Sequence, residues 1–445
     1  MLLNLCINNM NARELTFKAL NKILISGENS DTVLNNTTVK INISKQEKNL
    51  LYALTKGIIK RKLYLDYIIN WLNQNFDFKI SRNKFKNLIR LGLYQLIFMN
   101  SIPDYAAVNE TVNVCRKLYI SKLANKLNAI LRLYLRKKNL FRLPQEKINR
   151  MSVEYSFPEY LIENWLDRLG AEATEDLCSY FNRNPNLNLH FYGSEVEFQE
   201  FLNSLKQNEI GFSVSDYFQN SVKIHDNFDF RSDYYFDKGK YYIQDESAFL
   251  PVELLDVNNK ERILDLCAAP GGKTFDIASK TKTAIYANDI DMYRLNLLKE
   301  NAKRLNFDNI KFLNVDGTNY STDEKFDKIL LDAPCSGYGV IQKKPEIRLK
   351  SEENYKNLLP RQQKLLKNCA HLLKPEGVIV YSTCTMNIAE NQDQINKFLQ
   401  QHENFFLEDS GDYVDEFFVN DKFIETLPHI HKMDGSFAAR LRKKC

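Results

Sequence analysis

Between residues 262 and 384 the chain repeats one pattern: a short apolar run, a turn, and an amphipathic helical stretch. "RILDLCAAPGGKTFDIASK" and "TAIYANDIDMYRLNLLKENAKRLN" both show it, and further apolar runs follow in "KFLNVDG", "FDKILLDAP" and "GVIVYSTC". Strands that alternate with helices predict a doubly wound, mostly parallel α/β sheet. Such sheets bind ligands beyond the carboxyl ends of their strands, so we expect the chemistry in the loops that follow these runs.

Two of these runs end close to a cysteine. Cys335 lies in "LLDAPCSGYG" and Cys384 in "VIVYSTCTMN". A single cysteine is more often a small buried apolar residue than a nucleophile. A thiolate can, however, add to C6 of a cytosine, which makes C5 nucleophilic enough to accept a methyl group. Such a reaction also needs a carboxyl group to hold the N3/N4 edge of the base and a second group to assist release. Asp332 and the two cysteines supply these residue types, so together they favour this chemistry.

The turn in "DLCAAPGGKT" would bring a ligand to the backbone. Gly271 and Gly272 stand where a strand passes into a helix, which permits a tight turn and a close approach. Asp289 follows the next strand, in the position of a carboxylate that accepts hydrogen bonds from ribose hydroxyls. These features suggest a nucleoside-bearing cofactor without a pyrophosphate, of which S-adenosylmethionine is the common one. Asp289 could instead cap the following helix, and Asp316 could be a turn former or an adenosine contact.

The first third of the chain is helical and basic. Residues 1–150 hold 26 Lys and Arg against 9 Asp and Glu, a net charge of +17, whereas the remainder holds 35 against 47, a net charge of −12. In "NARELTFKALNKILI", Asn11 is placed to cap a helix that has Leu15, Ala19 and Ile23 on one face. A basic all-α domain is typical of an anchor for a polyanion, although a merely lysine-rich surface would give the same count.

Three domains are expected from the length and from these patterns. They are an all-α domain over residues 1–144, a small α+β module over residues 145–237 and an α/β catalytic domain over residues 238–445. The eight cysteines are scattered without metal-ligand spacing, so neither a disulfide framework nor a metal site is expected. No apolar stretch is long enough to span a bilayer and no signal peptide is recognisable, which indicates a cytoplasmic protein without membrane contact.

Two sets of motifs resemble known families. "LIRLGLYQLIFMNSIPDYAAVNETV" and "ANKLNAILRLYLR" resemble the NusB-like RNA-binding domain. "ILDLCAAPGGKT", "LLDAPCSGYG", "YSTCTMNIAENQDQI" and "DGSFAARL" resemble the NOL1/NOP2/Sun family of RNA cytosine-5 methyltransferases. The resemblance implies a Rossmann-like methyltransferase domain, with an RNA-recognition role for the module before it. After "GYGV" the family usually has a His-Pro-Asp stretch, where this chain has Lys344-Pro345-Glu346.

The resemblance also implies roles for individual residues. Cys384 would be the nucleophile, Cys335 would help to free the methylated product, and Asp332 would complete the catalytic set. Glu390 and Asn391 match a Glu-Asn pair that braces the loop of the nucleophile. The implied S-adenosylmethionine-binding residues are Cys267, Ala268, Ala269, Pro270, Gly271, Gly272, Lys273, Asp289, Asp316 and Asp332.

The implied substrate is a cytosine in 16S rRNA or in a precursor of the small subunit. The target base must be unstacked to reach a thiol. No protein partner is inferred, and a monomer is expected. Two alternatives remain open: the same chemistry on tRNA, and a non-catalytic RNA-binding assembly factor.

Overall fold

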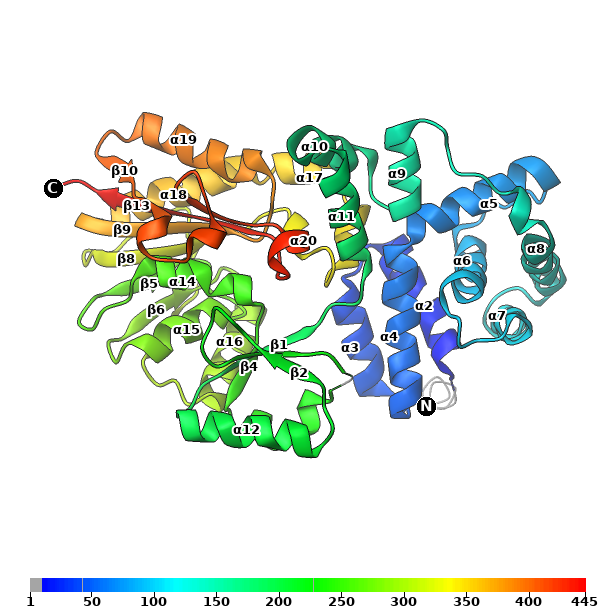
Figure 1. Cartoon of the computed structure of the whole chain (residues 1–445), viewed down its shortest axis with the longest axis horizontal. Coiled ribbons are helices and arrows are strands. Elements are labelled where there is room, and N and C mark those ends of the chain that lie inside the picture. The colour runs from blue at the N-terminus through cyan, green and yellow to red at the C-terminus, as the bar shows by residue number, and fades with distance from the viewer. Residues whose placement is uncertain (1–9, 42, 227) are drawn as a thin grey trace. The chain divides into compact units, whose positions relative to one another are not determined.

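The computed structural model describes residues 10–41, 43–226 and 228–445 (Figure 1). The chain forms two compact units, one comprising Met1–Asn182 with Lys344–Lys350 and the other comprising Arg183–Lys343 with Ser351–Cys445. This division assigns the start of the middle region to the first unit and the rest of it to the second. The boundaries of the three expected domains stay a prediction. No helix in the described ranges has both the length and the apolarity needed to cross a membrane.

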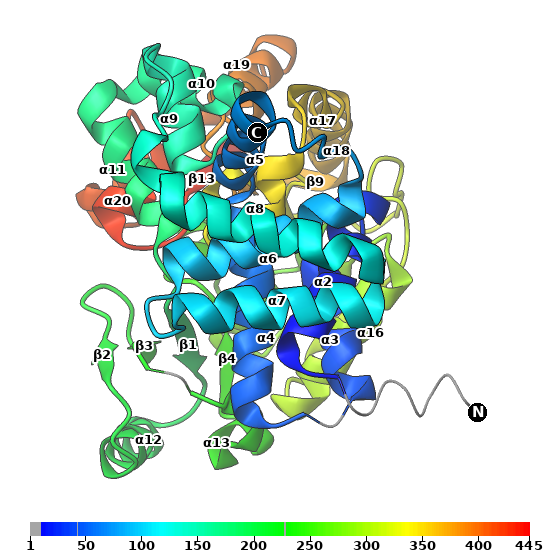
Figure 2. The ribbon, with the colours of Figure 1, turned by 90° about the vertical axis from the view of Figure 1, so that its right-hand side faces the viewer.

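The first unit is all-α, as predicted. Figure 2 shows its helices, which are α2 (Ala12–Ser26), α3 (Ser30–Lys40), α4 (Lys45–Lys60), α5 (Lys62–Phe76), α6 (Asn83–Phe98), α7 (Asp104–Leu118), α8 (Ala124–Lys137), α9 (Lys147–Tyr155), α10 (Glu159–Leu169) and α11 (Ala171–Asn182). The Asn11 side chain accepts a hydrogen bond from the Glu14 backbone and caps α2 as expected. Leu15, Ala19 and Ile23 are buried along one face of that helix.

A segment from the second half of the sequence belongs to this helical unit. Residues 344–350 lie in the first unit, and Arg348 is 3 % exposed there. Its guanidinium donates to the carbonyl oxygens of Lys60 at 2.9 Å and Phe181 at 3.2 Å, and to Oδ1 of Asn182 at 2.9 Å. It also lies 3.8 Å from the ring centroid of Phe157. Carbonyl dipoles and a π face therefore solvate this buried charge.

The second unit contains two sheets. The smaller is antiparallel, in the order β2 (Phe212–Val214), β3 (Ser221–Ile224), β1 (Leu187–Phe191), β4 (Tyr241–Ile243), and α12 (Glu195–Gln207) contributes to its core. An α+β module is present as predicted, although β4 lies beyond residue 237, where the module was expected to end. In the larger sheet, the parallel strands are β5 (Ile263–Asp265), β6 (Ile285–Asn288), β7 (Ile310–Leu313), β8 (Phe326–Asp332) and β9 (Leu373–Thr383).

The prediction of a mostly parallel sheet is too simple. Beyond β9 the sheet continues through antiparallel strands: β13 (Ser436–Lys443), which pairs with β9, β12 (Phe423–Thr426), β11 (Val419–Asn420) and β10 (Phe405–Leu407). These strands follow one another through short connections, so no strand–turn–helix pattern predicts them. The full order is β11-β12-β13-β9-β8-β5-β6-β7, with β10 paired to β13.

Helices cover both faces of the large sheet, and strand residues alternate between the two cores. Leu330 of β8 packs in the core formed with α14 (Leu250–Leu255), α15 (Gly272–Lys280) and α16 (Met292–Arg304). Ile329 and Leu331 pack on the other side, with α18 (Leu359–Leu372) and α19 (Gln392–Gln401). The two layers are visible in Figure 1. Burial on both faces explains why the parallel strands are continuously apolar in sequence.

The buried lysine beside Arg348 generates a prediction on stability. Lys60 is 8 % exposed, and burial, with the nearby charge of Arg348, lowers its pKa to about 7. The unfolded chain therefore binds more protons than the folded chain between about pH 7 and about pH 10, and Lys60 costs stability in full below that window. We expect Lys60→Met to raise the unfolding midpoint at about pH 6, and the gain to shrink as the pH approaches 10.

Lys18→Met is the matched control, because Lys18 is an exposed lysine of α2 in the same unit. Thermal or urea unfolding of both variants across this pH range makes the comparison. An equal gain at about pH 6 and about pH 10 would contradict an ionisation effect at Lys60.

Candidate active site

The glycine turn between β5 and α15 has the geometry that the sequence predicts. Gly271 caps α15 with φ of +115°, and a Cβ there would lie 2.5 Å from the Phe275 ring. Both the positive φ and this close contact require glycine. The backbone N–H of Ala268 donates to the carbonyl of Asn288 at 2.7 Å, which ties the turn to the end of β6.

Asp289 follows β6 and holds the same turn in place. It is 4 % exposed, and its carboxylate accepts hydrogen bonds from the backbone N–H groups of Ala269 at 3.2 Å and Asp291 at 2.9 Å. Arg294 lies 3.7 Å from this carboxylate. The cap of the next helix, considered as a role for Asp289, falls to Asp291, which accepts from Tyr293 and Arg294. Sequence alone could not separate two aspartates that stand two positions apart.

Asp316 acts as a turn former in this structure. Its carboxylate accepts hydrogen bonds from the backbone and the hydroxyl of Thr318, at 3.0 and 2.9 Å. These bonds lower the pKa of Asp316. Its neighbour Gly317, rather than Asp316, lines the cavity described below.

The two cysteines lie together. The Sγ atoms of Cys335 and Cys384 are 3.3 Å apart, although the residues are 49 positions apart in sequence. β8 and β9 are parallel neighbours in register, with Asp332 opposite Ser382, so the loops after both strands leave the sheet at one point. The backbone N–H of Gly339 donates to the carbonyl of Cys384 at 3.0 Å and holds the two loops together.

A buried carboxylate braces these loops. Glu390 is fully buried and accepts hydrogen bonds from the backbone and the hydroxyl of Ser336, at 2.8 and 2.5 Å. The Ser336 hydroxyl lies 2.8 Å from that of Thr385, next to the other cysteine. Asn391, also fully buried, donates to the Thr385 carbonyl at 2.9 Å. The predicted bracing role of Glu390 and Asn391 agrees with this geometry.

Asp332 is held by its neighbours. Its carboxylate accepts a hydrogen bond from Nζ of Lys273 at 2.7 Å and from the hydroxyl of Ser382 at 3.0 Å. The Lys273 side chain is 17 % exposed. Burial alone would lower the pKa of Lys273, but the ion pair and hydrogen bond with Asp332 raise it above its usual range. Lys273 is thus a charged anchor for Asp332 and not a water-facing lysine at a helix start.

The surroundings of Cys335 keep its thiol protonated. The hydrogen bond with Cys384, together with burial and the nearby acids Glu390 and Asp332, raises the pKa of Cys335 well above its usual range. Cys335 therefore stays a neutral thiol at physiological pH and can donate its proton to the neighbouring sulfur. Lys273 also interacts electrostatically with Cys384. The pair thus places a neutral thiol, able to donate a proton, 3.3 Å from the sulfur that is expected to be the nucleophile.

One cavity of about 360 Å³ joins these parts. Of the predicted residues, it is lined by Cys267, Ala269, Asp289, Asp332, Cys335 and Cys384. A smaller adjoining cavity of about 190 Å³ shares Cys267, Ala269 and Asp332 with it, and is also lined by Ala268, Pro270, Gly272 and Lys273. Gly271 lines neither cavity but shapes the turn between them. In the described part of the chain, no cluster of His, Cys, Asp and Glu could hold a metal ion.

The cavities also contain residues that the sequence analysis missed. Ile290 is an apolar side chain with 52 % exposure beside Asp289, and Arg361 of α18 adds a cation to the same wall. Asp265, at the end of β5, is 1 % exposed and lines the smaller cavity. Burial raises its pKa to about 7, and its Oδ1 has no hydrogen-bond partner among the described residues. The position of Asp265 at a strand end was a usable signal, whereas Arg361 lies within a helix that gave none.

Comparison with known proteins agrees with this arrangement. Residues 252–442 match the family described as 16S rRNA methyltransferase RsmB/F, and residues 10–136 match the NusB family. The chain is 32% identical over 447 residues to the probable ribosomal RNA small subunit methyltransferase B of Bacillus subtilis (strain 168), covering 97% of this chain and 98% of that protein. It is 32% identical over 443 residues to ribosomal RNA small subunit methyltransferase B of Photorhabdus laumondii, covering 98% and 100%.

A solved structure shows the same fold over nearly the whole length. The crystal structure of PH0851 superposes with a TM-score of 0.79 and 24% sequence identity, covering 98% of this chain and 99% of that chain. The resemblance inferred from the motifs is confirmed. The chain is a methyltransferase that belongs to the RsmB/F family of 16S rRNA methyltransferases, with a NusB-family domain in its N-terminal part.

Proposed function

We propose that the protein methylates C5 of a specific cytosine in 16S rRNA, with S-adenosylmethionine as the methyl donor and a covalent bond between Cys384 and C6 of the base as intermediate. The observation that carries this proposal is the 3.3 Å separation of the Cys335 and Cys384 sulfurs in a cavity that is also lined by Asp289 and by Cys267 and Ala269 of the turn after β5. The proposed substrate is 16S rRNA or a small-subunit precursor, met in the cytoplasm. The relatives from Bacillus subtilis and Photorhabdus laumondii, which are named as ribosomal RNA small subunit methyltransferases, support that choice.

The residues of the cavities fit the proposed cofactor. When bound, S-adenosylmethionine supplies a methyl group on a sulfonium. Asp289 would accept from the ribose hydroxyls, and Ile290 would cover the adenine. The unpartnered Oδ1 of Asp265 fits the ammonium of the methionine moiety, because a buried carboxylate oxygen without a partner is costly unless a ligand supplies a donor. Lys273 keeps Asp332 in place beside the turn.

Side chains of the cavity supply the nucleophile and the proton transfers of the proposed reaction. The Cys384 thiolate forms a bond to C6 while Asp332 holds the N3/N4 edge of the base. The electron density that this moves to C5 then forms the new bond between C5 and the methyl carbon. Cys335, held as a thiol 3.3 Å away, donates its proton to the departing sulfur as the C6–S bond breaks and the electron pair returns to Cys384. The Cys335 thiolate that results accepts the proton lost from C5, which restores the aromatic ring.

The basic first unit supports an RNA substrate. Its surplus of Lys and Arg would supply phosphate contacts and therefore an affinity that falls steeply with salt, while the cavity reads the base edge. The target base would be turned out of its stack to reach the two sulfurs.

Replacement of the nucleophile tests the core of the proposal. We expect Cys384→Ala to abolish transfer of labelled methyl groups to rRNA, because the nucleophile is removed and the thiols of Cys335 and Cys267 in the same cavity stay protonated. Cys445→Ala, at an exposed cysteine near the C-terminus, should keep the rate of the unmodified protein. Transfer by Cys384→Ala at the normal rate would refute the assignment.

Replacement of the second cysteine tests the release step. Cys335→Ser should form the bond between Cys384 and the base but break it slowly, so a protein–RNA band should survive a denaturing gel. The double variant Cys335→Ser/Cys384→Ala should show no such band. Complete turnover by Cys335→Ser without an adduct would remove Cys335 from the mechanism.

Glu390→Gln tests the brace beneath the two thiols. An amide places a donor opposite the N–H and O–H groups of Ser336, which shifts the loop of Cys335. A displacement of this kind can lower the turnover rate by about 100-fold. We expect kcat to fall while KM for S-adenosylmethionine is unchanged, since Glu390 does not line the cofactor cavity. Glu403→Gln, at an exposed glutamate, is the control, and an unchanged kcat in Glu390→Gln would contradict the positioning role.

A further inference from the structure

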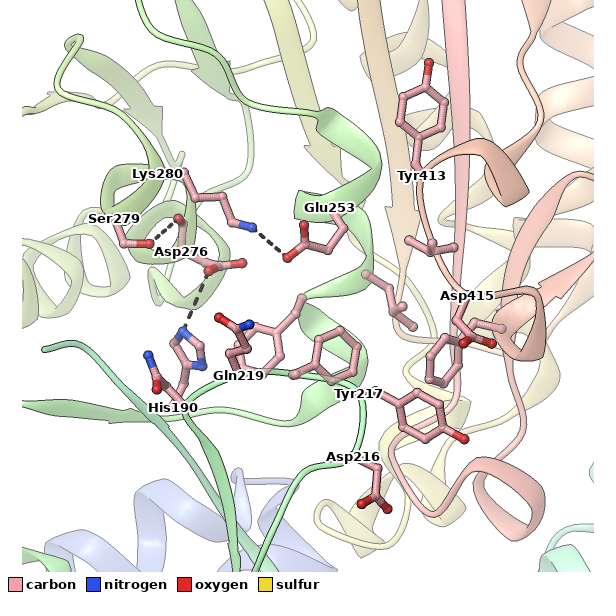
Figure 3. Close-up of a pocket in the computed structure, with 16 residues that line it drawn as sticks. His190, Asp216, Tyr217, Gln219, Glu253, Asp276, Ser279, Lys280, Tyr413 and Asp415 are labelled. Atoms are coloured by element: carbon pink, nitrogen blue, oxygen red, sulfur yellow. Dashed lines mark hydrogen bonds and ion pairs between the residues drawn. The ribbon is translucent and has the colours of Figure 1, made fainter. Parts of the chain in front are cut away.

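The second unit contains another cavity, of about 630 Å³, away from the two thiols (Figure 3). Its walls come from β1, the loop between β2 and β3, α14, the last turn of α15 and the segment before β11. Among the described residues, none lines both this cavity and the one that contains Cys335 and Cys384. The methyl-transfer chemistry therefore leaves this cavity unexplained.

Two polar side chains in this cavity each have a buried atom that lacks a hydrogen-bond partner among the described residues. Asp276 of α15 is 3 % exposed, and its Oδ2 atom accepts no hydrogen bond from the described residues. The Nδ1 atom of His190 likewise has no partner among them. Figure 3 shows the imidazole and the carboxylate directed at each other, but Nε2 of His190 is 3.9 Å from Oδ1 of Asp276, too far for a hydrogen bond. Such groups are costly unless a ligand satisfies them.

Aromatic rings form much of the remaining wall. Phe218 packs edge to face on Phe249 with ring centroids 5.3 Å apart, and it stacks on Phe418 at 6.0 Å. Tyr217 is 47 % exposed and packs edge to face on Phe418, with centroids 4.9 Å apart. Several π faces and edges are thus offered next to a buried carboxylate. A flat or cationic ligand gains most from this combination.

The charged residues of the wall determine whether the cavity suits a cation or an anion. Four acidic residues line the cavity: Asp216, Glu253, Asp276 and Asp415. Among the described residues, Lys280 is the only Lys or Arg that lines it. Nζ of Lys280 is already paired with Oε1 of Glu253 at 2.6 Å. An anion such as a phosphate would meet carboxylates here without a free cation to bind it, which excludes phosphate recognition.

We propose that this cavity binds the guanidinium group of an arginine side chain from a basic polypeptide, with Asp276 as its deep acceptor and the aromatic wall against its planar face. A guanidinium presents five N–H donors in a fixed plane, which can reach the carboxylate and the imidazole together, and it stacks on aromatic rings. An ammonium lacks that plane. The exposed acids Asp216 and Asp415 at the rim favour further basic residues and disfavour a free α-carboxylate.

Direct binding to the full-length protein tests the proposal. We expect N-acetyl-arginine amide, followed by calorimetry at about pH 8, to bind about ten-fold or more tightly than N-acetyl-lysine amide and than free arginine. Equal affinity for the lysine compound would refute the guanidinium assignment. Tighter binding of free arginine would refute the polypeptide as its source.

Variants locate the site. Asp276→Asn should weaken binding of N-acetyl-arginine amide by about ten-fold or more, because it removes the ionised acceptor. The same substitution should not reduce the unfolding temperature without ligand, since the carboxylate is buried without a full set of partners. Asp323→Asn, at an exposed aspartate of the same unit, should leave binding unchanged. Cys384→Ala should also bind normally, which separates this site from the proposed methyl transfer. Normal binding by Asp276→Asn would overturn the proposal.

The dependence of binding on pH supplies an independent test. Burial raises the pKa of Asp276 to about 7, while the charge of Lys280 lowers it and that of Glu253 raises it further. The uncharged side chains of His190, in β1, and Tyr192, just after β1, face Asp276. Burial lowers the pKa of His190 to about 4, so its ring stays neutral between pH 6 and 8. A cation binds the ionised Asp276 and releases its proton, so affinity should rise from about pH 6 to about pH 8 in the unmodified protein and stay flat in Asp276→Asn. An affinity for N-acetyl-arginine amide that falls over this range would refute the assignment of Asp276 as the ionised acceptor of the guanidinium.

Discussion

The parallel pairing of β8 with β9 is the constraint on which the candidate active site depends. Because Asp332 stands opposite Ser382 in this register, residues three and two positions further along arrive at the same place. A slip of one residue would turn the side chains of a strand to the opposite face, so the apolar cores on both sides of the sheet fix the register. The meeting of the two thiols thus rests on the packing of residues such as Leu330 and Ile329, far from any ligand.

Register alone brings the loops together but does not align the sulfurs. That alignment comes from polar groups that are removed from water, above all Glu390 with Ser336 and the backbone bond from Gly339 to Cys384. Each such bond contributes only about 1 kcal/mol net, but leaving one of its members unpaired costs more. The network is therefore better at specifying one geometry than at adding stability. It holds Cys335 at the height of Cys384 without contacting the substrate.

Much of the catalytic unit could be predicted from sequence because its signals are local. The glycine turn, Asp289, Asp332 and both cysteines each follow an apolar run, and the carboxyl ends of parallel strands meet at one edge of a sheet. The antiparallel strands from β10 to β13 lack the strand–turn–helix pattern that makes the parallel strands recognisable in sequence. Asp276 and His190 come from a helix and from a strand of the other sheet, so only the tertiary fold brings them together. The capping role of Asp291 instead of Asp289 depends on backbone geometry that a pair of nearby aspartates does not reveal.

Because Arg348 packs inside the first unit, that unit depends on a segment from the second half of the sequence. A gene fragment that ends at residue 182 would encode every α-helix described in the first unit but omit the seven residues, 344–350, that complete its interior. Such a fragment would expose the ring of Phe157 and leave the carbonyl oxygens of Lys60 and Phe181 without their donor. The first unit is for this reason not a separable module. Dissection, domain swapping or fusion at that boundary should retain this short stretch of the other half.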